Sequence, residues 1–447
     1  MIDNKTFYKN VSILVLPMAL QNLINVGISS TDVIMLGKIG EKTLSGASLG
    51  SQVYFILNLI LFGLTSGASV LIAQYWGKKD MKTIHKLFGI EIKFAMVVSS
   101  LFMIATLLFT EPIMHIFSND TEVIREGVRY LRSVSFSYML SAITMVYLNT
   151  MRSMERVKIG TIVYLCSLFT NIIANYLLIF TPFQLGAQGA AIGTCIAKVL
   201  ELLIVIFYDR TCNTTFRFQL RDLTVKDSVI LKDFLHFSMP VVFNELIWGT
   251  GVSAISAILG HLGSAATAAN SSAQVARQLA MVISLGIANA AAIMIGKAIG
   301  EGKNEHARSF GKKFVQLSII TGIFGSLVIL IARPVLLNFL VLTPTAKEYL
   351  SSMMFVMAYF VMAQSFNTTL IVGIFRAGGD TRFGLLLDAS TLWGVAIALG
   401  CIGAFLLKLP VIVVYMLLLS DEIIKIPLSF IRYRSYKWLK NVTKDNL

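Results

Sequence analysis

One carboxylate lies inside a long apolar segment near the start of the chain. Asp32 falls in the stretch 16–40, which is long and apolar enough to cross a membrane. An acid at such a depth costs about 2.5–3.5 kcal/mol on insertion scales, so a functional role is its default interpretation. Gln21 and Asn25 share its helical face because they are four residues apart and Asp32 follows seven later. We therefore expect this polar face to line a cavity or a neighbouring helix.

Two asparagines offer oxygen ligands that Asp32 could share. Asn171 and Asn175 lie four residues apart on another apolar segment, with Ser167 one turn earlier, so the three share a face. One carboxylate, two amide oxygens and hydroxyls suit a hard cation, and Na⁺ at Asp32 is one candidate. A carboxylate between low-dielectric walls can equally bind a proton. The alternative is a polar network that only holds helices together.

A second membrane carboxylate, Glu245, follows Pro240 by five residues and lies close to Trp248. A carboxylate beside an aromatic face would attract a lipophilic cation, so both residues are candidates for substrate binding. An ion pair or a polar network near the proline is the alternative. The other candidates for the cavity wall are polar residues on two later segments: Gln278, Gln364 and Asn367.

Other buried charges are expected to pair. Lys198 and Glu201 are three residues apart, the spacing of an ion pair on one helix. Asp388 follows Arg376 and Arg382 closely in the sequence, so we expect it to pair with them, with a role in ion coupling as the alternative.

The composition is that of a polytopic membrane protein. The chain has 447 residues, of which 56% are hydrophobic and 14% charged, and its mean hydropathy is +0.75. Four cysteines without pair spacing predict neither a disulfide framework nor a metal site, and no cleavable signal peptide is expected. Walker, HExxH and GxSxG patterns are absent from the sequence, so we predict neither ATP use nor an enzyme.

Twelve apolar stretches of membrane-spanning length predict an all-α fold. They are 11–36, 52–75, 88–110, 130–151, 160–181, 187–208, 235–260, 271–296, 313–332, 352–374, 384–407 and 409–431. With the N-terminus inside, the inner connections hold about three times as many Lys and Arg as the outer ones, so both termini are expected in the cytoplasm. The net charge of +14 is then a sign of topology rather than of nucleic-acid binding.

The second half of the sequence repeats the first. Pro17 and Pro240 are 223 residues apart, and Gly77 meets Gly300 at the same offset. Each half has six predicted spans, so the repeats have the same orientation in the membrane, which is typical of transporters. We expect two six-helix lobes, 1–208 and 234–447, joined by a cytoplasmic linker, 209–233.

Several motifs, in order along nearly the whole chain, resemble the MATE (multidrug and toxic compound extrusion) family of antiporters. They are Pro17, Gln21, Asp32, Gly37 and Gly40 in the first span, AQYWGKKD (73–80), NTMRSMERVKIG (149–160), GAQGAAIGT (186–194) and FRAGGDTRFG (375–384). The resemblance implies that Asp32 is the acid of the coupling site and that Asn171, Asn175 and Thr194 complete it. A second acid used by one branch of the family is an asparagine here. The tenth-span acid of another branch has no counterpart, with Ser365 at its position.

The resemblance implies an antiporter in the cell membrane that exports amphipathic, mostly cationic drugs or metabolites by alternating access. Inward movement of H⁺ or Na⁺ would drive the export, without any cofactor. The expected partners are small organic cations and membrane lipid, not nucleic acid, and the functional unit is expected to be a monomer. The alternative is a lipid-linked glycan flippase, whose relatives share the two-lobe plan.

Overall fold

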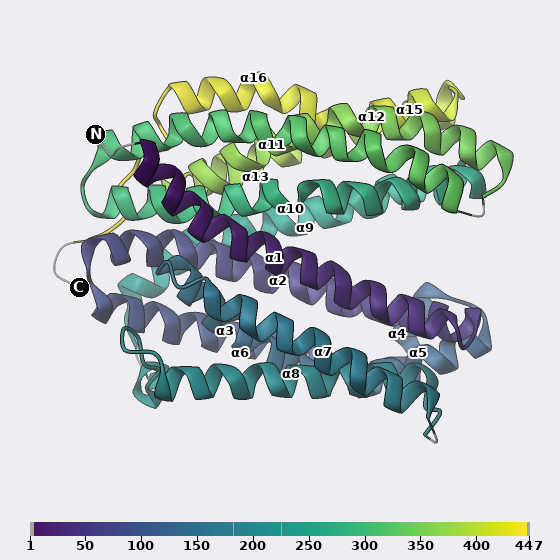
Figure 1. Ribbon diagram of the computed structural model, residues 1–447, viewed down its shortest axis with the longest axis horizontal. Helices are drawn as coiled ribbons and strands as arrows, with labels where there is room; N and C mark the ends of the chain where they lie inside the picture. The colour runs from purple at the N-terminus through teal and green to yellow at the C-terminus, as the bar shows by residue number, and fades with distance from the viewer. Residues whose placement is uncertain (1–3, 182, 225, 341, 445–447) are drawn as a thin grey trace. The chain divides into compact units, whose positions relative to one another are not determined.

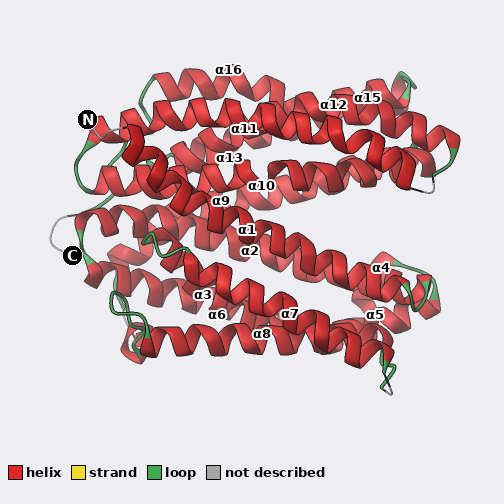
Figure 2. Ribbon diagram, viewed as in Figure 1, coloured by secondary structure: helices red, strands yellow, loops and turns green. Residues whose placement is uncertain are grey.

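The computed structural model describes residues 4–181, 183–224, 226–340 and 342–444, and every regular element within them is a helix (Figures 1 and 2). The α-helices are α1 (Asn4–Gly37), α2 (Glu41–Lys78), α3 (Met81–Leu108), α4 (Thr110–Phe117), α5 (Thr121–Val134), α6 (Ser137–Ser153), α7 (Lys158–Phe180), α8 (Gly186–Thr211), α9 (Ser228–His261), α10 (Ser264–Gly300), α11 (Asn304–Phe339), α12 (Pro344–Thr368), α13 (Thr381–Asp388), α14 (Ala398–Cys401), α15 (Val411–Leu418) and α16 (Asp421–Arg434). A 3₁₀ turn, η1, covers Leu220–Thr224, and three π-helical segments are η2 (Thr369–Phe375), η3 (Ala389–Ile397) and η4 (Ile402–Leu406).

Ten helical stretches of the described chain are long and apolar enough to cross a membrane. An eleventh is obtained if α5 and α6, which meet at a bend of 51°, form one span. The all-helical, multi-pass fold is therefore confirmed. The predicted twelfth span, 409–431, is divided between α15 and α16, so the count of twelve stays a prediction, as does the cytoplasmic position of the termini.

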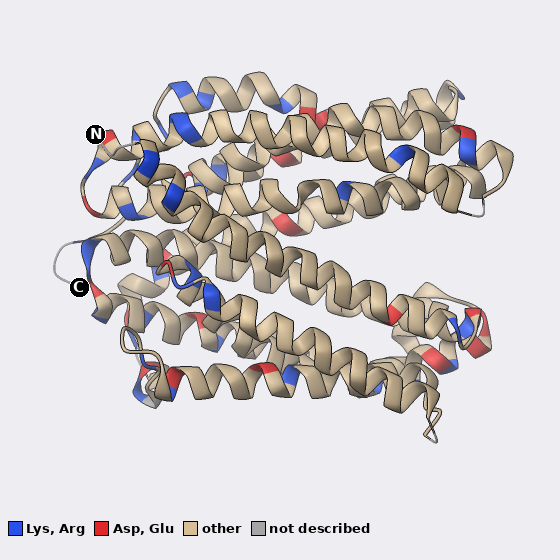
Figure 3. Cartoon of the chain, viewed as in Figure 1, with Lys and Arg blue, Asp and Glu red and all other residues tan. Residues whose placement is uncertain are grey.

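Helices extend well beyond the apolar stretches that predicted them. The prediction placed the start of the second span at 52, whereas α2 begins at Glu41. Hydropathy marks only the part of a helix that meets hydrocarbon, while backbone hydrogen bonds continue through polar residues at its ends. Figure 3 shows the result: Lys, Arg, Asp and Glu gather near helix ends and connections, and few lie midway along a helix.

The chain forms two compact units. One contains the residues up to Ala19, Ala73–Lys79 and everything from His236 onward; the other contains Leu20–Ile72 and Asp80–Leu235. We call them the C-unit and the N-unit. This division groups residues by packing, whereas the predicted lobe boundaries rested on the repeat, so those boundaries stay a prediction.

The core of the C-unit depends on small residues along α10. Ala269, Ala273, Ala276 and Ala280 recur every three or four residues and are all buried. Such a stripe lets neighbouring backbones approach, which is how membrane helices gain packing energy. Larger buried side chains of α12, among them Met357, fill the remaining space.

Two glycines make a reciprocal crossing between the ends of α2 and α10, within the C-unit. A Cβ on Gly77 would lie 2.1 Å from the carbonyl oxygen of Lys297, and one on Gly300 would lie 1.8 Å from that of Gln74. Gly77 and Gly300 are equivalent in the repeat, and Gln74 and Lys297 are separated by the same 223 residues. Each repeat therefore contributes the same glycine and the same carbonyl to one contact.

The connection between the halves is held against the N-unit. His85 of α3 lies 2.9 Å from the Asp222 carboxylate of η1, and Gly89 makes room for the Asp222 carbonyl. Lys86 binds Asp227 at 2.9 Å, and this bond is the main reason that the pKa of Asp227 is lowered. The predicted linker is therefore pinned to α3 by two side-chain contacts.

Candidate ion-coupling site

Asp32 of α1 contacts α7 through an amide. The Asn175 side-chain nitrogen donates to the Asp32 carboxylate at 2.6 Å and to the Asn171 side-chain oxygen at 3.3 Å. Both asparagines are buried, whereas Asp32 is half-buried. The structure thus brings together the carboxylate and the two amides that the sequence proposed as a cluster.

A glycine of α8 makes room for this arrangement. A Cβ on Gly193 would lie 2.1 Å from the Asn175 side-chain oxygen, so the amide lies directly against the α8 backbone. That oxygen is buried and has no hydrogen-bond partner within the described ranges, and the same holds for the Asn171 side-chain nitrogen. An unoccupied acceptor beside a carboxylate suits either a cation or the hydroxyl of a protonated Asp32. Thr194, the next residue on α8, is half-buried, and its role as a ligand stays a prediction.

The other polar residues of α1 have different surroundings. Gln21 is buried and donates to the Val157 carbonyl at 2.9 Å and to the Thr161 hydroxyl at 3.1 Å, which ties α1 to the start of α7. Asn25 is exposed. One helical face thus passes from a packed contact at Gln21 to a half-buried carboxylate at Asp32.

The residues of the C-unit that were predicted to bind substrate also differ in their surroundings. Glu245 forms an ion pair with Arg376 at 2.8 Å, the alternative that the sequence analysis left open for it. Trp248 is half-buried and Gln278 is exposed. Gln364 is buried and accepts from Arg277 at 3.4 Å. Their roles in substrate binding stay predictions.

One predicted pairing is confirmed and another is wrong. Lys198 binds Glu201 at 2.8 Å, as its spacing on one helix predicted. Asp388 does not pair with Arg376 or Arg382: its carboxylate binds Lys425 of α16 at 2.8 Å. Arg376 binds Glu245, and Arg382 lies 3.3 Å from a ring nitrogen of His236. The error arose because nearness in sequence was taken for nearness in space.

Sequence reasoning missed the partners of Lys425. Asp421 and Glu422 bind it at 2.8 and 3.2 Å, and Asn367 of α12 donates to the Glu422 carboxylate at 2.7 Å. A signal was present, because two acids and a lysine within the last apolar stretch are costly in a membrane.

Glu91 was also missed. It lies one-third of the way along α3, is fully buried, and neither carboxylate oxygen has a hydrogen-bond partner among the residues that the structure describes. An unpaired buried charge is far costlier than a neutral acid, so we take this side chain to be in its acid form.

Replacing Glu91 with methionine is expected to stabilise the protein by about 1–2 kcal/mol, because a buried polar group without a partner is lost while the volume is kept. Thermal unfolding of the purified protein would measure it. Glu201→Met is the matched control: it strands Lys198 and should cost about 3–5 kcal/mol. A lower melting temperature for Glu91→Met would show that the carboxyl has a role in holding the fold.

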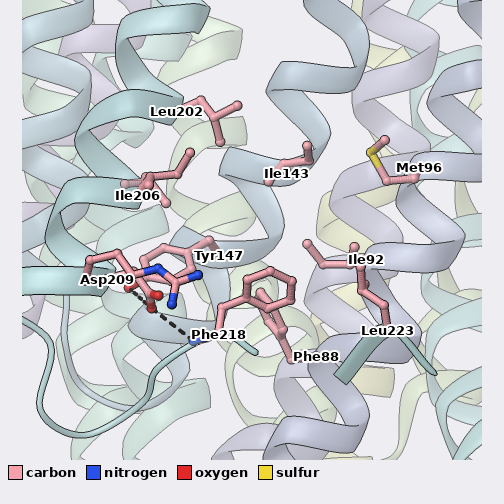
Figure 4. A pocket seen from close by; sticks show the side chains of 12 residues that line it. Phe88, Ile92, Met96, Ile143, Tyr147, Leu202, Ile206, Asp209, Phe218 and Leu223 are labelled. Atoms are coloured by element: carbon pink, nitrogen blue, oxygen red, sulfur yellow. Dashed lines mark hydrogen bonds between the residues drawn. The ribbon is translucent and has the colours of Figure 1, made fainter. Parts of the chain in front are cut away.

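A separate cavity of about 300 Å³ opens in the N-unit between α3, α6, α8 and the connection that follows α8 (Figure 4). Apolar and aromatic side chains dominate its wall, among them Phe88, Ile92 and Leu202. Its carboxylate, Asp209, already accepts from the Tyr147 hydroxyl at 3.1 Å and the Phe218 backbone nitrogen at 3.2 Å. The Asp209 carboxylate is thus already engaged, and the side chain of Arg210 also lines this mainly apolar cavity.

The helices and the carboxylates inside them define a multi-pass membrane protein with repeated halves. The chain belongs to the MatE family, whose model matches residues 17–177 and again 240–402. The two matched segments begin at Pro17 and Pro240, so they also confirm the internal repeat.

Curated relatives of the chain are similar along nearly their whole length. A protein of Thermotoga maritima named probable multidrug resistance protein NorM is 22% identical, over 96% of this chain and 92% of its own. Probable multidrug resistance protein YoeA of Bacillus subtilis is 23% identical, over 91% and 89%.

Solved structures show the same fold. One, described as the outward-facing conformation of a multidrug resistance MATE family transporter, superposes with a TM-score of 0.89 at 18% identity, over 98% of this chain and 97% of its own. Another, a MOP superfamily transporter from Pyrococcus furiosus, superposes with a TM-score of 0.88 at 18% identity, over 96% and 95%.

Proposed function

We propose that this chain is a secondary antiporter that exports small amphipathic organic cations, driven by protons or sodium ions that bind at Asp32. The observation that carries the proposal is the contact between Asp32 and Asn175, beside a buried amide oxygen that has no partner within the described chain. The multidrug resistance relatives support export of organic compounds. They give no support to the glycan flippase, the alternative from the sequence.

The geometry suggests how ion binding is coupled to α1. Binding of a proton or Na⁺ at Asp32 removes its negative charge, and the carboxylate then holds the Asn175 amide nitrogen less strongly. Since Asp32 and Asn175 lie on different helices, this weakens a link between α1 and α7. A cationic substrate held near Asp32 loses its electrostatic attraction at the same time. Each net positive charge that moves inward across 100 mV contributes about 2.3 kcal/mol to export.

Transport by the purified full-length protein in proteoliposomes tests the proposal. Efflux of ethidium would be followed by fluorescence under an imposed proton gradient, then under a sodium gradient, then with neither. Efflux that depends on one gradient establishes antiport and identifies the ion. Equal efflux with and without gradients would exclude coupling, and no efflux of ethidium or of a second organic cation would exclude the substrate class.

A further inference from the structure

Four charged residues meet inside the C-unit, far along the chain from Asp32. The Lys425 ammonium of α16 lies 2.8 Å from Asp388, 2.8 Å from Asp421 and 3.2 Å from Glu422. All four side chains are less than 10% exposed as residues, and Lys425 is 2% exposed. We call this group the Lys425 cluster. It places three carboxylates around one cation.

Neighbouring charges do not balance the cluster. Arg277 of α10 interacts electrostatically with Glu422 and with the Tyr415 hydroxyl of α15. Glu245 of α9, which lies near enough to Asp388 to feel its charge, is already paired with Arg376. The full set thus has four carboxylates and three cations, so one negative charge is left over. A net charge buried within membrane helices is strongly disfavoured, and one proton would remove it.

An amide beside the cluster lacks a hydrogen-bond donor. The Asn367 side-chain nitrogen donates to the Glu422 backbone oxygen at 2.6 Å and to its carboxylate at 2.7 Å, and these two acceptors fix the orientation of the amide. The amide oxygen at the other end is buried and has no partner in the part of the chain that the structure describes. A buried polar side chain with one unfilled hydrogen-bonding position therefore lies directly against the cluster.

The backbone is irregular where two members of this site lie. Asp388 directly precedes the π-helical segment η3, and Asn367 lies two residues before η2. π-helical turns occur mostly as short insertions in α-helices, frequently at functional sites. Asp388 and Asn367 thus contact α16 at the points where α13 and α12 pass into π-helical segments.

We propose that the Lys425 cluster is a second protonation site, in which Asp388, Asp421 and Glu422 share one exchangeable proton next to Asn367. The proton comes from water and returns to it, and no covalent bond between heavy atoms changes. A proton suits the site better than a metal ion, because the described residues hold no group of three or more His, Cys, Asp or Glu that fits a metal. The site stands without transport; its use in coupling rests on the function proposed above.

Infrared difference spectra of the full-length protein in lipid nanodiscs, recorded during a pH titration, would detect the proton through the carbonyl stretch of a carboxylic acid. The background variant Asp32→Asn removes the acid of the candidate ion-coupling site. We expect the Asp32→Asn protein to keep a carboxylic-acid band that appears on acidification. We expect Glu422→Gln in that background to abolish the band or to shift its titration midpoint by at least tenfold in proton concentration. Glu305→Gln, which removes an exposed carboxyl of the C-unit from its surface pair with Arg308, is the control and should leave the midpoint of the band unchanged.

Lys425→Gln provides a second measurement if Glu422→Gln does not fold. Losing the cation leaves the carboxylates with more negative charge, so the titration midpoint should move to higher pH. A band unchanged by Glu422→Gln, or by Lys425→Gln when that is the variant that folds, would overturn the proposal. A band that responds in a protein without gradient-driven efflux would keep the proton site and reject the antiport function, so the two failures are distinguishable.

Discussion

Replacing Asp32 with asparagine is expected to abolish gradient-driven export while leaving the fold intact. In the wild type, the Asn175 nitrogen lies 2.6 Å from the Asp32 carboxylate. Asparagine at position 32 keeps the size of the side chain and an oxygen that can accept this hydrogen bond. It removes the negative charge that would bind a proton or Na⁺ and attract a cationic substrate. The variant binds no coupling ion, so its export should fall to the passive level.

Ethidium efflux from proteoliposomes with matched protein content would measure this loss. Glu122→Gln is the control, because Glu122 is an acid of the same unit engaged in an exposed ion pair with Lys42. Such pairs contribute only about 0–1 kcal/mol, so this variant should transport normally. Full efflux by a well-folded Asp32→Asn protein would remove Asp32 from the mechanism.

Gly300→Ala is expected to prevent recovery of folded protein. The added Cβ would lie 1.8 Å from the Gln74 carbonyl oxygen, and real Cβ atoms essentially never approach other atoms closer than 3.0 Å. Backbone cannot yield as a flexible side chain can, so α2 and α10 would have to separate along their packed ends. Ordinary overpacking costs about 1–3 kcal/mol, and this overlap is more severe. Gly77→Ala, the equivalent change, should fail in the same way.

Gel filtration and thermal unfolding after expression would measure whether these variants fold and how stable they are. Gly394→Ala is the matched control, since Gly394 is also helical but nothing lies within 4 Å of its added Cβ. Alanine has the higher helix propensity, by about 1 kcal/mol, so this control should be as stable as wild type or more so. A monodisperse Gly300→Ala protein with an unchanged melting temperature would disprove the close crossing.

The sequence predicted best where periodicity or local spacing decides the outcome. Apolar length predicted the spans, the spacing of three residues predicted the Lys198–Glu201 pair, and a shared helical face predicted that the side chains of Asn171 and Asn175 lie together. Each inference needs only the geometry of one α-helix.

Contacts between helices that are distant in the sequence could not be predicted. Lys425 binds Asp388 across 37 residues of sequence, and π-helical turns between them break the 3.6-residue period from which faces are read. Glu91 was missed because Lys86 and Lys93 flank it, which makes the segment resemble a membrane–water boundary. Which acids lack a partner is decided by packing, and that is visible only in the structure.

The reciprocal crossing of Gly77 and Gly300 has a further consequence. In this contact, the glycine of each repeat packs against the equivalent carbonyl of the other repeat. Such a contact is isologous, which is the geometry of a two-fold homodimer. The two repeats have the same predicted orientation, so that axis would run along the membrane normal. The two repeats are thus joined here as two copies of one half-length chain would be. Away from this contact they differ: Asp32 has no counterpart in the other repeat, where Ile255 stands at the same offset.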